Sequence, residues 1–170
     1  MIKIYKSYLS LGSNIGDRES NIAQAITALG VYDSINNLES SSLYLTEPLY
    51  NLEQEYFINT VIGIETSLNP FALLDTLKKI EIMLGRKIIK KKNMPRIIDI
   101  DILVHGDSII ETSELVIPHP FISQRKFVLI PFDEIAPDYK IPLLNSSIHE
   151  LLVNCKDESS VRLHDMEHKA

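Results

Sequence analysis

Two aspartates stand two residues apart in the segment from Pro95 to Ile102, which is otherwise mostly apolar and typical of a β-strand. Successive side chains of a strand point to opposite faces, so Asp99 and Asp101 share one face and the isoleucines share the other. Carboxylates held roughly 6–7 Å apart repel each other and need a positive partner. Mg²⁺ fits, because proteins usually hold it with one or two carboxylates plus substrate phosphates. Two solvated aspartates on an open strand face are the alternative interpretation.

A basic segment precedes this strand. Six basic residues and no acidic residue occupy the positions from Arg86 to Arg96, although the chain as a whole has a net charge of −6. Guanidinium and ammonium groups beside paired carboxylates suit a nucleoside triphosphate and its metal ions. Arg86 follows Gly85 and Arg96 follows Pro95, so both arginines stand where the backbone is constrained and a planar guanidinium can be aimed. The lysines between them are equally explained as a solvated loop.

Length and composition favour a single globular domain over residues 1–170. The chain has 45% hydrophobic and 24% charged residues, which is typical of such domains. The polar tail, residues 156–170, is expected to be poorly ordered in part. We expect a monomer.

Several functional classes are disfavoured. No apolar run is long enough to span a bilayer, and the N-terminus lacks the features of a signal peptide, so we expect a cytoplasmic protein without a membrane partner. Cys155 is the only cysteine, which excludes an intrachain disulfide. Nucleic-acid binding needs a broad basic surface, which a net charge of −6 argues against.

Hydrophobic periodicity and turn residues predict the elements that position these groups. Strands are predicted over residues 7–12, 35–46, 56–66 and 97–104, with helices from Asp17 to Gly30 and from Asn69 to Gly85. The order β-α-β-β-α-β predicts an α+β, ferredoxin-like core, a mainly antiparallel sheet with helices on one side. C-terminal additions follow, including a short helix that begins with a capping box at Ser147 and Glu150.

Three further features could contact a ligand. Phe57 and Asn59 share a strand face, so an aromatic ring and an amide could hold a flat heterocycle, although a core role is the ordinary interpretation. His119 has little backbone freedom between two prolines. The connection over residues 47–55 is long for a hairpin, which makes it a candidate functional loop. The glycines at 12 and 16 lack the ending of a phosphate-binding loop and are interpreted as turn residues.

Several motifs occur together and in a fixed order. They are Gly12-Ser13-Asn14, Phe57-x-Asn59, Glu81-x-x-x-Gly85-Arg86, Pro95-Arg96-x-x-Asp99-x-Asp101 and Pro118-His119-Pro120. With these motifs the chain resembles the 6-hydroxymethyl-7,8-dihydropterin pyrophosphokinase family of folate biosynthesis over roughly residues 7–140. The resemblance implies a ferredoxin-like α+β fold, two Mg²⁺ ions and small-molecule substrates. ATP would donate its terminal two phosphates to the pterin hydroxymethyl group, leaving AMP.

The resemblance also implies roles for individual residues. Asp99 and Asp101 would be the magnesium ligands, and Arg86 and Arg96 the catalytic, phosphate-binding arginines. Nucleotide contacts are implied for Glu81, Lys92, Ile98, His119 and Arg125. Pterin contacts are implied for Thr46, Leu49, Phe57, Asn59 and Phe127. The chain departs from the family pattern at Glu47, Ile88 and the Asn93-Met94 pair, which bears on how the loops 47–55 and 86–95 close over the substrates.

Two other functions remain open on the sequence. Palm-type nucleotidyl transferases and cyclases share the element order and paired aspartates, but they need a further carboxylate from a neighbouring strand and release pyrophosphate. A ferredoxin-like scaffold can also serve as a ligand-binding domain without catalysis, because this fold hosts many functions.

Overall fold

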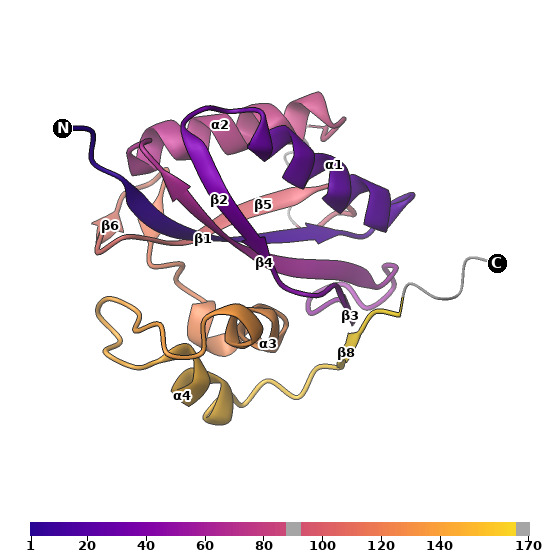
Figure 1. Ribbon diagram of the computed structural model, residues 1–170. Helices are drawn as coiled ribbons and strands as arrows, with labels where there is room; N and C mark the ends of the chain where they lie inside the picture. The colour runs from indigo at the N-terminus through magenta and orange to yellow at the C-terminus, as the bar shows by residue number, and fades with distance from the viewer. Residues whose placement is uncertain (88–92, 166–170) are drawn as a thin grey trace.

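The computed structural model describes residues 1–87 and 93–165. Within these residues the centre of the molecule is a six-stranded antiparallel sheet with helices on both faces, as Figure 1 shows. The strands lie in the order β5 (Asp99–His105), β1 (Tyr5–Ser13), β4 (Phe57–Thr66), β3 (Tyr44–Thr46) and β8 (Val161–Leu163). A further strand, β2 (Ile35–Ser40), pairs with another stretch of β4. The remaining strands, β6 and β7, form a separate two-stranded ribbon.

The ferredoxin-like prediction is confirmed. The core consists of β1 (Tyr5–Ser13), α1 (Arg18–Gly30), β2 (Ile35–Ser40), β3 (Tyr44–Thr46), β4 (Phe57–Thr66), α2 (Pro70–Met83) and β5 (Asp99–His105). β1 lies between β4 and β5 and is antiparallel to both. The neighbouring strands β4, β1 and β5 therefore form one continuous surface on each face of the sheet.

The single strand predicted over residues 35–46 is divided into β2 and β3. Ser41 is the reason, because its side chain competes with the strand ladder. Its hydroxyl accepts a hydrogen bond from the backbone N–H of Val61 at 3.1 Å and lies 2.9 Å from the Thr60 hydroxyl. A serine side chain that replaces a backbone group in this way interrupts regular pairing.

The first two helices cover one face of the sheet. Asp17 caps α1 by accepting from Ser20 N–H, and Asn69 caps α2 by accepting from Ala72 N–H, as predicted. Both helices bury their apolar sides against the sheet. The fully buried residues of this core include Ile22, Leu29, Leu73, Leu77, Ile80 and Ile98. Each such side chain contributes roughly 1.5–3 kcal/mol through removal from water.

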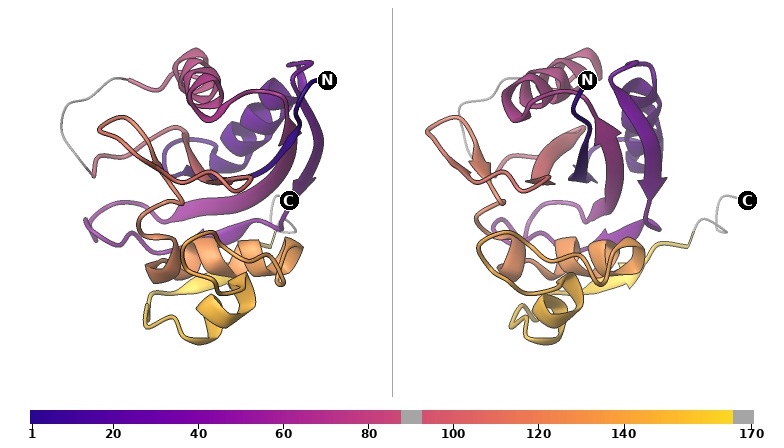
Figure 2. Two further views of the ribbon diagram at one scale, coloured as in Figure 1. Left: turned by 90° about the vertical axis from the view of Figure 1, so that its left-hand side faces the viewer. Right: turned by 60° about the vertical axis from the view of Figure 1, so that its left-hand side comes forward.

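The prediction that helices cover only one face of the sheet was incomplete. The C-terminal additions place α3 (Lys126–Ile135) and α4 (Ile148–Val153) on the opposite face, which Figure 2 shows from two directions. The short elements β6 (Ile110–Glu111), β7 (Val116–Ile117) and η1 (Ile122–Gln124) lead into α3. The predicted capping box at Ser147 is present at the start of α4. A second apolar core, with Phe132 at 0% exposure, joins α3 and α4 to the sheet.

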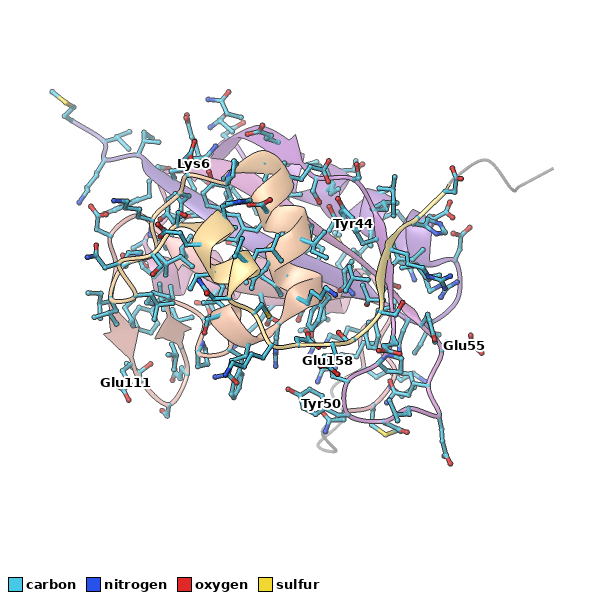
Figure 3. All side chains as sticks on the ribbon, turned by 90° about the horizontal axis from the view of Figure 1, so that it is seen from below. Lys6, Tyr44, Tyr50, Glu55, Glu111 and Glu158 are labelled. Carbon is cyan, nitrogen blue, oxygen red and sulfur yellow. The ribbon has the colours of Figure 1, made fainter. Side chains whose placement is uncertain are left out.

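Part of the polar tail forms an ordered strand. Residues Val161–Leu163 are β8, which pairs with β3 at the sheet edge. Just before it, the backbone N–H of Ser160 donates to Glu47 Oε1 at 2.7 Å. His164 Nε2 lies 2.6 Å from Glu19 Oε1 on α1. In Figure 3 the loop that carries Tyr50 and Glu55 lies at the same end of the molecule as the Glu158 segment.

No helix among the described residues has the length and apolar character needed to cross a membrane.

Candidate active site

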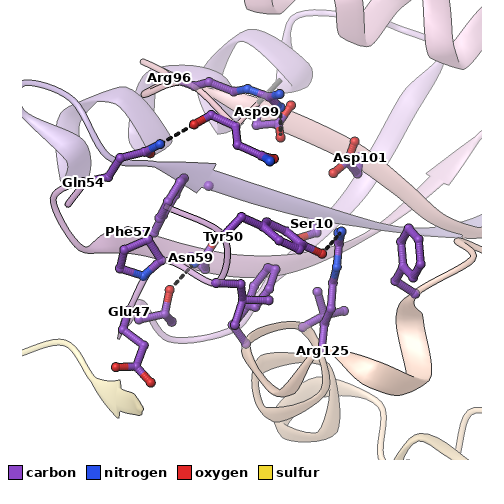
Figure 4. A pocket seen from close by; sticks show the side chains of 18 of the residues that line it. Ser10, Glu47, Tyr50, Gln54, Phe57, Asn59, Arg96, Asp99, Asp101 and Arg125 are labelled. Atoms are coloured by element: carbon purple, nitrogen blue, oxygen red, sulfur yellow. Dashed lines mark hydrogen bonds and ion pairs between the residues drawn. The ribbon is translucent and has the colours of Figure 1, made fainter. Parts of the chain in front are cut away.

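A cleft of about 300 Å³ opens on the sheet face that α3 covers only in part. Its floor consists of side chains from the three adjacent strands β5, β1 and β4. Its walls are the loop of residues 47–55, the segment 93–96 and the chain from His119 to Val128. The cleft and its labelled residues appear in Figure 4. One end of this cleft lies beside β4, and the other end lies beside β5.

The two aspartates share the floor of the cleft, as their spacing predicts. Asp99 pairs in register with Gly12, and Asp101 pairs with Ser10. The intervening Ile100 lies in the apolar core on the other face, with 4% of its surface exposed. Alternation along β5 therefore places both carboxylates in the cleft, next to the small residues of β1.

Two arginines converge on Asp99. Arg86 Nη1 lies 2.8 Å from Asp99 Oδ1, and Arg96 Nη1 lies 2.7 Å from Asp99 Oδ2. Arg86 also forms an ion pair with Glu81 of α2. The constrained arginines predicted from their glycine and proline neighbours therefore meet at the first of the paired carboxylates. Beside Asp99, both guanidinium groups are placed where they can bind phosphate oxygens.

Asp101 differs from Asp99 in its environment. No hydrogen bond or ion pair joins the Asp101 carboxylate to another described residue, although the charges of Arg125 and Arg96 act on it. Burial raises the pKa of Asp101 to about 7, and the nearby charges of Asp99 and Glu81 act in the same direction. A bound cation strongly stabilises the charged form of a buried carboxylate whose oxygens have no hydrogen-bond or ion-pair partner.

Glu81 supports the strand edge. Its Oε1 accepts a hydrogen bond from the backbone N–H of Ile100 at 2.6 Å. Because β5 is an edge strand, this N–H has no strand partner, and the carboxylate supplies one. Burial raises the pKa of Glu81 to about 7. Glu81 is not among the residues that line the cleft, so it contacts the site through Arg86.

The end of the cleft beside β4 contains an amide held in a fixed orientation. Asn59 Nδ2 donates to Thr46 Oγ1 at 2.6 Å, and both residues are buried. Phe57, Phe127 and Leu49 line the cleft around this amide. Gly12 leaves room for it, since a Cβ atom at this position would lie 2.4 Å from Asn59 Oδ1. An aromatic lining with one oriented amide suits a flat, polar heterocycle.

The end of the cleft beside β5 contains His119 and Arg125. The backbone N–H of His119 donates to Leu103 O at 2.9 Å, which ties this turn to β5. Phe121 N–H donates to His119 Nδ1 at 3.2 Å, so a neutral imidazole carries its proton on Nε2. Burial and the Arg125 charge lower the pKa of His119 to about 4. The guanidinium of Arg125 lies 5.0 Å from the centroid of the Phe121 ring.

The family model for 7,8-dihydro-6-hydroxymethylpterin-pyrophosphokinase (HPPK) matches residues 8–137. The chain belongs to this family. The matched segment contains every site residue discussed above, from Gly12 to Phe127.

Relatives within the HPPK family support this placement. The 2-amino-4-hydroxy-6-hydroxymethyldihydropteridine pyrophosphokinase of Methylorubrum extorquens is 40% identical over 136 residues, which covers 80% of this chain and 85% of the relative. The enzyme of the same name from Bacillus subtilis is 43% identical over 129 residues, which covers 76% of this chain and 77% of the relative.

A solved structure supports the fold. The HPPK-DHPS protein of Plasmodium falciparum, crystallised with pteroate, superimposes with a TM-score of 0.71 at 21% identity. The match covers 89% of this chain and 42% of the Plasmodium chain, so this chain spans less than half the length of that protein. At this identity the likeness concerns the fold alone.

The structure brings most of the residues expected from the HPPK resemblance into one cleft. The cleft is lined by Thr46, Leu49, Phe57, Asn59, Arg96, Asp99, Asp101, His119, Arg125 and Phe127. Arg86 and Glu81 join it through Asp99. Ile98 is fully buried in the core on the far face of β5, so its side chain does not reach the cleft. Lys92 and Ile88 lie outside the described residues, as do residues 88–92 of the loop 86–95.

Several residues that line the cleft were not predicted from the sequence, among them Gly12, Gln54 and Tyr50. Gly12 was predicted as the last residue of a strand and interpreted as turn chemistry, whereas it lies within β1, opposite Asn59. A glycine within a strand pattern is itself a signal of close approach, and that signal was available. Gln54 and Tyr50 line the cleft from the loop 47–55, and nothing in their spacing distinguishes them from their polar neighbours.

The donor set fits magnesium held together with phosphate. Within the described residues no group of three or more His, Cys, Asp or Glu side chains could hold a metal ion. Two carboxylates on one strand face are the ligands that Mg²⁺ takes when substrate phosphates complete its shell.

Proposed function

We propose that this chain carries out the reaction of the HPPK family in this cleft and that its paired aspartates hold two magnesium ions. The chain transfers the pyrophosphoryl group of ATP to the hydroxymethyl group of 6-hydroxymethyl-7,8-dihydropterin, giving AMP and the pterin diphosphate, in folate biosynthesis. The observation that supports the metal assignment best is the shared floor position of Asp99 and Asp101, with two arginines directed at the same place.

The pterin is held at the β4 end. Its ring lies between the aromatic side chains of Phe57 and Phe127, and the Asn59 amide hydrogen-bonds its edge. The hydrogen bond to Thr46 orients the Asn59 amide before the pterin binds. Orientation in advance lowers the entropy that binding would otherwise cost.

ATP is held at the β5 end, with its phosphates over Asp99 and Asp101. Arg86 and Arg96 bind phosphate oxygens, and His119 donates its Nε2–H to the nucleotide. Phosphoryl transfer depends mainly on alignment and electrostatic stabilisation, so these residues act by placing the β-phosphorus in line with the pterin hydroxyl. Magnesium ions, when bound, neutralise phosphate charge and lower the pKa of the attacking hydroxyl.

The hydroxyl oxygen attacks the β-phosphorus and gives its proton to one of the paired aspartate carboxylates of the cleft floor. The bond from that phosphorus to the oxygen shared with the α-phosphate breaks, and its electron pair leaves with AMP. Arg86 and Arg96 stabilise the charge that develops on the phosphate oxygens. The loop 47–55 and the described segment 93–96, which line the cleft, exclude water that would otherwise hydrolyse ATP.

The decisive experiment is incubation of the purified chain with ATP, Mg²⁺ and the reduced pterin alcohol, with identification of both products. AMP and pterin diphosphate are expected. Asp101→Asn should abolish turnover, whereas Asp107→Asn, which changes an exposed aspartate just after β5, should leave it unchanged. Release of pyrophosphate instead of AMP would favour a palm-type reaction. Pterin binding without turnover would favour a binding domain.

Monomeric state, cytoplasmic location and the absence of a nucleic-acid partner stay predictions from composition and charge. Size-exclusion chromatography with light scattering tests the first of them.

A further inference from the structure

The floor of the cleft contains a polar side chain that the reaction described above does not use. Ser10 of β1 lines the cleft, and only 8% of its surface is exposed. Its hydroxyl forms no hydrogen bond with another of the described residues. Burial of a hydroxyl without a partner is unfavourable, and a ligand that supplies the missing hydrogen bond removes this cost. The Ser10 hydroxyl is therefore available to a molecule bound in the cleft.

Strand pairing places Ser10 between the two ends of the cleft. Ser10 pairs in register with Val61 of β4 on one side and with Asp101 of β5 on the other. In the view of Figure 4, Ser10 lies between Asn59 and Asp101. Neighbouring strands lie about 4.8 Å apart, so β4 and β5 are separated by about 10 Å, with β1 between them. A ligand that extends from one end of the cleft to the other must cross β1.

The proposed pterin substrate makes this crossing. Its ring lies beside Asn59, and its hydroxymethyl oxygen must reach the β-phosphorus over the paired aspartates. On the cleft face, the residues that β1 contributes to the lining are Ser10 and Gly12, and Gly12 has no side chain. Tyr8, the next residue on this face, belongs to the second apolar core. The Ser10 hydroxyl is therefore the polar group that β1 presents to the hydroxymethyl group.

We propose that Ser10 is a specificity-determining residue whose hydroxyl donates a hydrogen bond to the hydroxymethyl oxygen of the pterin. The contact selects a pterin that carries this alcohol over one that carries a methyl group at the same carbon, because the methyl compound leaves the buried hydroxyl unpaired. An alcohol oxygen has two lone pairs, so it accepts from Ser10 with one and keeps the other for the β-phosphorus. This inference rests on the proposed function, since it assumes that the pterin ring binds beside Asn59.

The same strand offers a matched control. Ser10→Ala removes one hydroxyl from the floor of the cleft. Ser7→Ala makes the same change in β1, where Ser7 is 0% exposed and its hydroxyl has no hydrogen-bond partner either. Three positions separate the two serines, so alternation directs the Ser7 side chain to the opposite face of the sheet. Ser10→Cys is a second variant, because a thiol has a similar shape and is a weaker donor.

Titration calorimetry with two pterins separates a contact to the alcohol from a merely structural role. The ligands are 6-hydroxymethyl-7,8-dihydropterin and 6-methyl-7,8-dihydropterin, each measured with Mg²⁺ and an ATP analogue in which a methylene group replaces the oxygen between the α- and β-phosphates. In Ser10→Ala we expect the affinity for the alcohol to fall about 3- to 10-fold, which corresponds to one hydrogen bond. The affinity for the methyl compound should stay the same or rise. Ser10→Cys should give an intermediate loss, and Ser7→Ala should match the unchanged chain for both ligands.

Two results would overturn the inference. Equal losses for both pterins in Ser10→Ala would show a general distortion of the cleft floor, and an unchanged affinity for the alcohol would show that the contact does not form. If Ser10→Ala does not fold, the same two results in Ser10→Cys decide the question. Both leave the proposed function standing as long as the unchanged chain forms AMP and pterin diphosphate. Absence of those products would instead remove the proposed function itself.

Discussion

Gly12 and Asn59 face each other across β1 and β4, at a distance that leaves no room for a side chain on the first residue. A Cβ atom on Gly12 would lie 2.4 Å from Asn59 Oδ1. The Asn59 amide therefore lies close against Gly12 of β1, where its hydrogen bond to Thr46 holds it. The orientation of the residue expected to recognise the pterin thus depends on an absent side chain in the neighbouring strand.

Gly12→Ala should weaken pterin binding, because the added methyl group displaces the Asn59 amide. We expect a loss of at least about tenfold in affinity, which corresponds to the loss of one oriented hydrogen bond in a buried site, or about 1.5 kcal/mol. Titration calorimetry with the pterin measures it. Gly30→Ala is the control, since a Cβ atom there meets nothing within 4 Å. Equal pterin affinity in both variants would contradict the proposed role of Asn59.

Arg96→Ala should slow the chemical step more than it weakens nucleotide binding. Its guanidinium lies 2.7 Å from Asp99, where transferring phosphate oxygens would be placed. Removing a group that stabilises transition-state charge lowers rates by about 100-fold or more. Single-turnover rates of AMP formation at saturating substrates measure this effect. Arg162→Ala, which changes an exposed arginine on β8, should behave as the unchanged chain. An unaltered single-turnover rate in Arg96→Ala would assign this arginine a structural role.

Asp101 should make the metal-free protein less stable as the pH rises. Burial raises the pKa of its carboxyl to about 7 in the folded chain, whereas the unfolded value is about 3.9. The folded chain therefore holds this proton more tightly, and its stabilising effect is complete below about pH 4 and is lost as the pH approaches about 7. Asp101→Asn removes this dependence. We expect the variant to be more stable at pH 8 by on the order of 1–3 kcal/mol.

Urea unfolding in the presence of EDTA at pH 4.5 and pH 8 checks this expectation. The stability difference between the variant and the unchanged chain should be large only at the higher pH. A difference of the same size at both values would show that it does not come from the titration of Asp101. Added Mg²⁺ should bind more tightly at pH 8 than at pH 6, because the metal and the proton compete for the same carboxylate.

His119 should remain neutral near pH 7. Burial lowers its pKa to about 4, and the Phe121 N–H occupies Nδ1, so the Nε2–H form should dominate between pH 6 and pH 8. Long-range ¹H–¹⁵N NMR spectra of the imidazole identify the tautomer directly. A protonated ring at pH 6 would contradict this assignment. The pH dependence of turnover in this range should therefore come from other groups.

Local patterns in the sequence predicted much of this architecture. The caps at Asp17 and Asn69 are short-range signals, and the alternation around Asp99 depends only on strand geometry. Two kinds of information were missing. The division of the strand at Ser41 depends on a hydrogen bond to Val61, twenty residues away, and the close approach of Gly12 to Asn59 depends on which strands pair. Both are tertiary effects that a local pattern does not contain.

The same distinction applies to the site. Asp99, Asp101 and the two arginines could be grouped because they are close in sequence. Asn14 and Gln54 are 40 positions apart, and only the folded chain brings their amides together. The resemblance to a family supplied residues that spacing alone could not, such as Phe127, which reaches the cleft from α3.

The strand β8 has a consequence for engineering of this chain. It pairs with the outer edge of β3, and β3 directly precedes the loop that begins at Glu47. Truncation before residue 156 would uncover that edge, and an uncovered strand edge invites pairing with another molecule. A shortened version should therefore self-associate through β3 and lose its anchor for the neighbouring loop, although every residue assigned to chemistry would still be present.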